Sequence, residues 1–206
     1  LGGSDGVVFI EDNLFEYTGE GTAAMHAVAS NRGARYVFRH NILEAIYRTD
    51  YHFAAPIDAH GYCFGHPRGT VSYEIYGNVI RSARSYRGMF IRGGSGVIYD
   101  NRLEGHPRDG CPTGSCYGFP IPLTNYRSCQ SCSEGGMCTS YPCQDQISNL
   151  YIWNNTVMGT PLTPDVEGCA ADDVREDRDF FLQEPPDYAP YPYPHPLAGG
   201  TGGSGG

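Results

Sequence analysis

The chain has 206 residues, and its 23 acidic against 14 basic side chains give it a net charge of −9. This acidic balance argues against binding to nucleic acid or to acidic membrane surfaces, both of which attract basic proteins. No stretch is long and apolar enough to cross a membrane as a helix. The 28 glycines, 15 prolines and 16 tyrosines are typical of a single turn-rich β domain with a long, narrow core.

A short phrase recurs along the chain, in which a run of β-forming side chains closes on an asparagine that further apolar residues follow. The five copies are Val7–Phe15, Tyr36–Leu43, Tyr73–Ile80, Val97–Leu103 and Leu150–Val157. Alternating Val, Ile, Tyr and Phe predict strands. Repetition on this scale indicates a solenoid, and the intervals suit a three-sided parallel β-helix of roughly twenty-odd residues per coil with loop insertions.

The asparagines of this phrase are predicted to stack on one another. They are Asn13, Asn41, Asn78, Asn101 and Asn155. Asparagine tolerates left-handed backbone and hydrogen-bonds locally at turns. Because neighbouring strands lie about 4.8 Å apart, amides of successive coils can form a ladder inside the turn. A β-sandwich with hairpin turns is the alternative, but it gives no reason for the same ending in every copy.

A second strand precedes each phrase and ends near glycine. The copies are Met25–Gly33, Pro56–Gly61, Met89–Gly94 and a weaker one, Phe119–Asn125. Glycine suits a sharp corner that needs unusual dihedral angles. Each coil is therefore predicted to be a strand, a glycine corner, a second strand, an asparagine corner and a variable loop. The predicted fold is all-β, a right-handed parallel β-helix over residues 1–183, whose bare N-terminal strand edges need a capping segment or another copy.

Most of the eight cysteines lie in a Gly-, Ser- and Pro-rich insertion predicted at 104–146. Those within it are Cys111, Cys116, Cys129, Cys132, Cys138 and Cys143, and the other two are Cys63 and Cys169. An even number in such a segment favours a disulfide-stapled loop and an oxidising compartment. The spacing of Cys129 and Cys132 also suits a redox pair or half a zinc site, which stay as alternatives.

The C-terminal region differs in composition from the repeats. Residues 184–198 are rich in proline and tyrosine, which favours an extended polyproline II strap along the solenoid, with a docking peptide for a partner as the alternative. The acidic run Asp172–Asp179 before it is interpreted as a solvated face. Calcium is the one cofactor that this acidic run suggests, and the sequence predicts no defined metal site. Residues 199–206 have the composition of a flexible linker.

Several of these motifs together resemble a known group of proteins. They are Ile57–Gly61, Ile91–Gly94, Cys143–Ile147, Tyr151–Asn155 and Tyr191–Leu197. The combination resembles bacterial extracellular right-handed parallel β-helix proteins of the pectate-lyase-like superfamily. The resemblance extends to about Leu197 and implies an extracellular or cell-surface location. It leaves the activity open, because related β-helices include polysaccharide lyases, glycoside hydrolases, phage tailspikes and adhesins.

Candidate catalytic residues follow from aligning the glycine-corner strands. If Ile57 and Ile91 point inward, alternation places Asp58, His60, Phe90 and Arg92 on the outer wall. His26 is expected one coil away. A carboxylate, imidazoles and a guanidinium on one wall can serve as base, acid and clamp for a substrate carboxylate.

Two reactions and one structural role are open for this wall. A lyase would use Arg92 or His60 to remove the proton α to a uronate carboxylate. A hydrolase needs two carboxylates, for which Asp58 with Asp50 or Asp100 is a poor pair. In the structural alternative, Asp58 and His60 brace the loop 62–68 and Arg92 pairs with Asp58.

Two functional hypotheses follow from the sequence. The first is an extracellular protein that binds or processes polysaccharide, or a cell-surface glycan, at an outer wall. The second is a structural or adhesive surface module without catalysis that self-associates through the β-helix ends, up to fibres.

Overall fold

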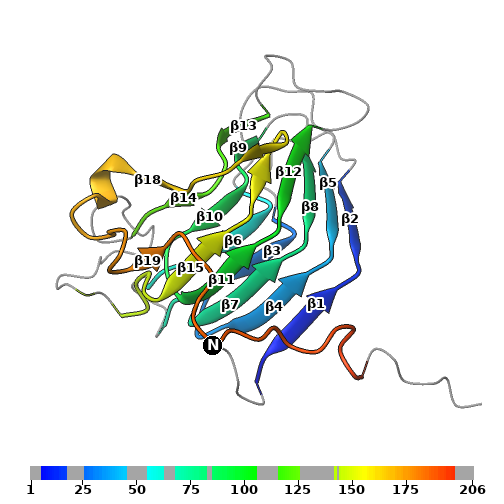
Figure 1. Cartoon of the computed structure of the whole chain (residues 1–206), viewed down its shortest axis with the longest axis horizontal. Coiled ribbons are helices and arrows are strands. Elements are labelled where there is room, and N and C mark those ends of the chain that lie inside the picture. The colour runs from blue at the N-terminus through cyan, green and yellow to red at the C-terminus, as the bar shows by residue number, and fades with distance from the viewer. Residues whose placement is uncertain are drawn as a thin grey trace, which may run out of the picture.

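The computed structural model describes residues 6–17, 26–45, 55–62, 68–82, 85–105, 116–125, 142 and 144–197. The regular secondary structure of this part of the chain is β-strand, apart from one short 3-10 helix, η1 (Gly168–Ala170). Its strands form three parallel sheets, here named A, B and C, which surround one core (Figure 1).

Each sheet collects one strand from successive passes of the chain. Sheet A contains β1 (Val8–Glu11), β4 (Arg35–Arg39), β7 (Ser72–Tyr76), β11 (Ser95–Tyr99), β15 (Leu150–Trp153) and β19 (Phe180–Phe181). Sheet B contains β2 (Leu14–Tyr17), β5 (Ile42–Ala45), β8 (Val79–Ser82), β12 (Arg102–Gly105), β16 (Thr156–Val157) and β17 (Thr160–Pro161). Sheet C contains β3 (Val28–Ser30), β6 (Ile57–Ala59), β10 (Met89–Ile91), β14 (Pro122–Leu123) and β18 (Asp165–Val166). A small separate sheet pairs β9 (Ser85–Arg87) with β13 (Tyr117–Phe119).

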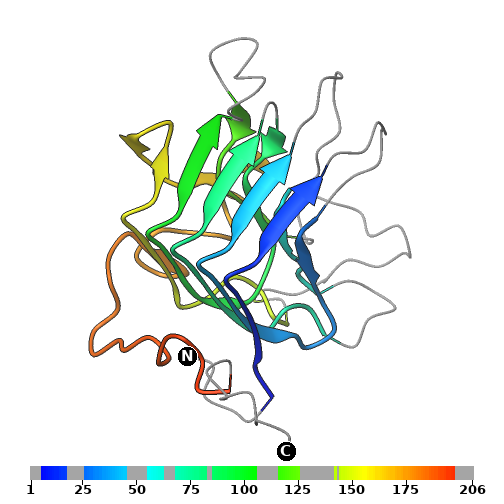
Figure 2. The ribbon, with the colours of Figure 1, turned by 90° about the vertical axis from the view of Figure 1, so that its right-hand side faces the viewer.

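The chain passes through sheets C, A and B in a fixed order, so that β6, β7 and β8 form one coil. Strands of neighbouring coils pair in parallel, as sheet B shows in Figure 2, and β16 with β17 is the antiparallel exception in the described part. Parallel pairing is consistent with a β-helix and contradicts a hairpin-built sandwich. The sequence predicted the apolar residues after each asparagine only as the end of a phrase. In the structure they form sheet B, the third side of the solenoid.

The inward faces of the three sheets make up the core. Ile57 and Ile91 are completely buried there, as the alternation predicted. Phe38, Ile75 and Leu103 join them from sheets A and B. The hydrophobic burial of each coil therefore depends on its two neighbours, which is the behaviour expected of a solenoid.

The corner between sheets A and B has the same backbone in every coil. The residue before each ladder asparagine adopts a positive φ: Asp12 (58°), His40 (56°), Gly77 (66°), Asp100 (53°) and Asn154 (52°). The left-handed residue is thus the one before the asparagine, rather than the asparagine itself as the sequence suggested. Glycine, asparagine and aspartate adopt left-handed backbone most readily, and histidine is also enriched in this region, which accounts for all five corner residues.

The asparagine side chains form a continuous ladder through these corners. In each step, the main-chain N–H and side-chain Nδ2 of one asparagine both donate to Oδ1 of the next. For Asn78 and Asn101 these distances are 3.1 and 2.9 Å. Equivalent pairs join Asn13 to Asn41, Asn41 to Asn78, and Asn101 to Asn155. These hydrogen bonds therefore align successive coils with one another. They also pair the main-chain N–H groups of the buried corner, which water cannot reach.

The predicted cysteine-rich insertion is not one uninterrupted loop. Strands β13 and β14 lie inside the range 104–146 and belong to the sheets. Cys116 and Cys169 are both disulfide-bonded, and neither described cysteine is free. The predictions for Cys63, Cys111, Cys129, Cys132, Cys138 and Cys143 lie outside the described residues.

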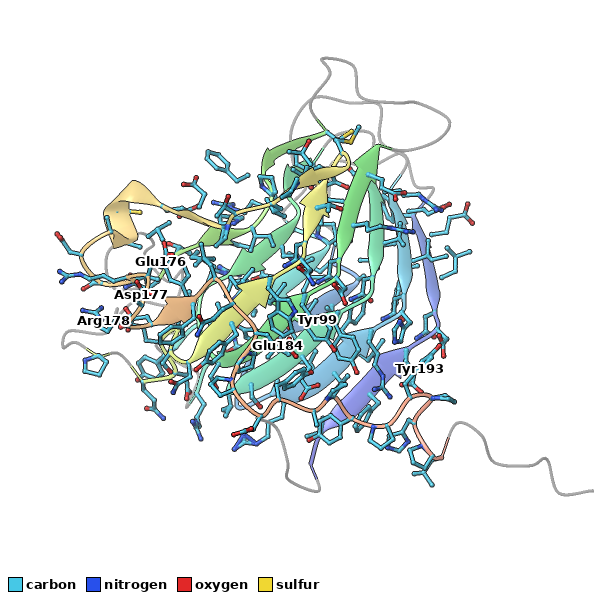
Figure 3. All side chains as sticks on the ribbon, in the orientation of Figure 1. Tyr99, Glu176, Asp177, Arg178, Glu184 and Tyr193 are labelled. Carbon is cyan, nitrogen blue, oxygen red and sulfur yellow. The ribbon has the colours of Figure 1, made fainter. Side chains whose placement is uncertain are left out.

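The C-terminal segment, residues 184–197, runs from β19 across the outer face of sheet A to β1, and we call it the strap (Figure 1). Figure 3 shows Tyr193 at the β1 end and the turn Glu176–Arg178 on the opposite side of the molecule. The acidic run forms this turn, in which Arg178 pairs with Asp179. The end of the solenoid nearby is closed, because Ala170 and Val174 reach into the core and β17 folds back on β16.

Candidate functional site

Sheet C brings together the residues predicted for the outer wall. Asp58 is the central residue of β6 and pairs in register with Ala29 of β3 and Phe90 of β10. Ile57 and Ala59 on either side of it face the core, so alternation directs Asp58 to the outer face. His26 precedes β3, His60 follows β6 and Arg92 follows β10. The predicted set of four thus meets around one carboxylate, from three successive coils.

Arg92 binds Asp58 with both branches of its guanidinium. Its Nε donates to Oδ1 at 3.0 Å, and Nη2 pairs with Oδ2. The side chains of Asp58 and Arg92 are only 3% and 9% exposed. A two-pronged pair fixes the carboxylate plane as well as its position.

Two histidines flank the same carboxylate. His60 Nε2 lies 3.1 Å from Asp58 Oδ2 and also contacts Arg92 Nη2. His26 Nε2 lies 3.8 Å from Asp58 Oδ2, while its Nδ1 donates to the main-chain oxygen of Ala55. The imidazoles are 28% and 23% exposed, so they form the accessible part of the cluster.

The neighbours of Asp58 decide its charge. Burial raises the pKa of the Asp58 carboxyl, but the hydrogen bond with His60 and the charge of Arg92 outweigh burial and leave the pKa below its usual value. Asp58 is therefore an anion at neutral pH. An anionic carboxylate fixed beside an imidazole holds the ring in one orientation.

An aromatic ring completes the wall. Phe90 lies between two guanidinium groups, with Arg92 Cζ 4.5 Å and Arg87 Cζ 3.8 Å from its ring centre. Arg87 in turn binds Glu167 at 2.8 Å. These contacts hold the arginines against the sheet by cation–π attraction and ion pairing.

Of the two carboxylate pairs predicted for a hydrolase, Asp58 with Asp100 is not assembled. Asp100 lies at the corner after β11 of sheet A, whereas Asp58 is in sheet C. Asp50 lies outside the described residues. The bracing alternative is met in part, because Arg92 does pair with Asp58, but Arg68 at the end of the loop 62–68 pairs with Asp145.

Sequence reasoning missed a second polar site, on the outer face of sheet A. Arg39 is fully buried there, and it binds Glu11 Oε2 at 2.7 Å, Tyr76 Oη at 2.6 Å and two carbonyl groups of the strap. A signal existed: Glu11, Arg39, Tyr76, Tyr99 and Trp153 each stand two places before a ladder asparagine. Aligning the phrases on the asparagine therefore predicts one outward row.

Neither a metal centre nor a membrane segment is found in the described part of the chain. Its His, Cys, Asp and Glu side chains nowhere form a group of three arranged to hold a metal ion. No helix within the described ranges has the length and hydropathy of a transmembrane span.

Comparisons with known proteins identify no relative. No protein-family model, curated protein or solved structure matches this chain. Membership of the pectate-lyase-like superfamily accordingly stays a prediction from the motifs.

Proposed function

We propose that this protein binds or processes polysaccharide at the outer wall of sheet C. The observation that carries the proposal is the convergence of His26, Asp58, His60 and Arg92 from three coils on one face. A polymer with regular spacing suits such a wall, because the solenoid repeats its side chains at about 4.8 Å.

Within this proposal, His60 is the proton-transfer group. Asp58 orients its imidazole, and Arg92 is a positioning residue rather than a base, because its guanidinium is committed to both oxygens of Asp58. Among the described residues the cluster has one carboxylate at its centre, which fits elimination at a uronate better than hydrolysis by paired carboxylates. His60 would take the proton α to the uronate carboxylate, and a carbon–carbon double bond would form as the bond to the glycosidic oxygen breaks. The leaving oxygen would take up a proton from water, which gives an unsaturated end.

Two finer assignments belong to the same proposal. We infer that the coil is right-handed, since crossover connections between parallel strands strongly prefer this hand, and that the fold is of the pectate-lyase-like type. We also infer an extracellular or cell-surface location, with the insertion stapled by disulfides. The disulfide-bonded Cys116 and Cys169 support it, because such bonds persist in oxidising compartments.

The test is to measure binding and cleavage of polygalacturonate, alginate and a neutral glucan. We expect the wild type to act on a uronate polymer, and His60→Ala to lower turnover about 10²–10⁴-fold while binding persists. Arg102→Ala is the matched control, because this arginine is 60% exposed on sheet B, away from the cluster. Full turnover by His60→Ala would reject the site, and a wild type inert toward all three polymers would reject the function.

A second candidate function is a structural module that associates through its N-terminal end. Asn13 Oδ1 accepts no hydrogen bond within the described residues, so the ladder is open at its first step. A hollow of about 370 Å³ opens at the same end beside Ile10, Val28 and Val8, which is 58% exposed. Since the other end is closed by β17 and η1, this geometry favours pairs of N-terminal ends over fibres.

This candidate predicts a concentration-dependent dimer. Sedimentation velocity should show association of the wild type in the micromolar range, and Val8→Lys should abolish it, because a charge on an edge strand opposes pairing. Leu182→Lys, at an exposed position outside the N-terminal end, serves as the matched control. A wild type that stays monomeric at every concentration would exclude the second candidate.

A further inference from the structure

The outer face of sheet A carries a row of aromatic rings that the strap covers. Tyr76, Tyr99 and Trp153 stack in successive coils, with ring centres 4.6 and 4.3 Å apart and planes within 13° and 7°. Tyr188 of the strap stands edge-on to Tyr99 and Trp153 at 5.8 and 5.9 Å. The sheet supplies the stacked rings, and the strap supplies a ring that packs edge-on against them.

The same face also recognises the backbone of the strap. Arg39 donates to the carbonyl oxygens of Tyr191 at 2.7 Å and of Pro192 at 2.8 Å. The main-chain N–H of His195 donates to Glu11 Oε1 at 2.8 Å. Glu11 also pairs with Arg39. This one ion pair therefore donates to two carbonyl oxygens of the strap and accepts from one of its main-chain N–H groups.

Specific side-chain contacts fix the register of the strap. Tyr188 Oη donates to Glu74 Oε2 at 2.9 Å, and Tyr193 Oη donates to Asp12 Oδ1 at 2.6 Å. The Tyr193 ring also lies 4.1 Å from the ring of His40. Aromatic grooves with such anchors are the usual way in which proteins bind proline-rich, extended peptides.

The strap is held by the sheet more than by itself. Within it, the described hydrogen bonds are those from Tyr188 N to Pro185 O and from Leu197 N to His195 Nδ1. Its connection to β19 is exposed at Leu182, Gln183 and Glu184. The contacts that recognise the strap therefore lie on sheet A, and they require a ligand of this sequence rather than a covalent connection.

We propose that the outer face of sheet A is a recognition groove for extended proline- and tyrosine-rich peptides, and that its ligand in trans is the strap of a second copy. The chain's own strap occupies the groove at the high effective concentration of a tethered ligand. Exchange of an identical segment between copies then needs movement only at the exposed connection. This inference is independent of the site on sheet C.

The test uses the full chain carrying Tyr188→Ala and Tyr193→Ala, which loosens the tethered strap and leaves the groove unchanged. A synthetic peptide of residues 184–197 stands for the strap of a second copy. Trp153, the single tryptophan, reports binding because Tyr188 of the peptide would again contact its ring. We expect saturable binding that restores the wild-type tryptophan emission. Binding should be at least about tenfold weaker for a peptide with alanine in place of Tyr188 and Tyr193.

The wild-type chain is the control for occupancy and should respond far less, since its own strap fills the groove. A second form guards against misfolding of the variant: a protease site between Gln183 and Glu184, cut after folding, should release the strap on dilution and rebind the peptide. Absence of binding to both folded forms would overturn the proposal. Equal binding of the alanine peptide would overturn it too, because the groove would then lack specificity.

Discussion

Replacing Asn101 with alanine should destabilise the protein by about 3–5 kcal/mol, the scale of several buried hydrogen-bonding groups left without partners. Asn101 Oδ1 accepts from the main chain and the side chain of Asn78. Its Nδ2 donates to the carbonyl oxygens of Ile75 and Tyr99 and to Asn155 Oδ1. The residue is completely buried, so water cannot take over these roles.

Asn13→Ala is the matched control, because it removes the same carboxamide from the open end of the ladder. Asn13 is exposed, and its main-chain N–H still reaches Asn41 Oδ1 at 3.0 Å after the substitution. We expect a loss of about 1 kcal/mol or less at this position. Urea denaturation followed by circular dichroism measures both values. Equal losses at Asn13 and Asn101 would mean that burial of the ladder contributes nothing to stability.

The ladder also explains how far sequence reasoning reached. The strands, the stacked asparagines and the meeting of Asp58 with His60 and Arg92 all follow from a repeat in which equivalent positions must superpose. One residue aligned in every coil is enough to superpose the equivalent positions, and the asparagine is that residue. The rows two places before and after each asparagine then follow by alternation.

The burial of Arg39 could not be predicted in the same way. An arginine on an outward row is ordinarily expected to be solvated. What covers it is the strap, whose Tyr191 stands 152 residues later in the chain. No periodicity connects the two segments, so their contact rests on chemical complementarity between a guanidinium, carbonyl groups and aromatic rings.

Replacing Glu11 with alanine should destabilise the protein by about 3–5 kcal/mol, because it leaves the buried Arg39 guanidinium without its counter-ion. Arg39 is 0% and Glu11 9% exposed in this pair. The variant also loses the acceptor for His195 N–H, so the strap should detach at its β1 end. Denaturation gives the free energy of unfolding, and limited proteolysis within residues 184–197 reports release of the strap.

Glu104→Ala is the control, because its ion pairs with Arg81 and Arg102 lie on the outer face of sheet B and are partly exposed. Such surface pairs contribute about 1 kcal/mol or less. The double variant Glu11→Ala with Arg39→Met should lose less than the sum of its parts, since removing both charges leaves no buried ion. A cost for Glu11→Ala no larger than that of Glu104→Ala would contradict the importance of this pair.

The Glu11 carboxylate also predicts how acid acts on the strap. Burial raises the pKa of Glu11, but the hydrogen bonds from His195 N–H and Arg39 outweigh burial and leave the pKa below 4.5. A carboxyl with a lower pKa in the folded state stabilises that state above pH 4.5 and loses this contribution as the pH falls through the folded value. Protease sensitivity of the strap should therefore rise below pH 4.5 in the wild type. In Glu11→Ala it should already be high at neutral pH, because the carboxylate that accepts from His195 N–H and pairs with Arg39 is gone.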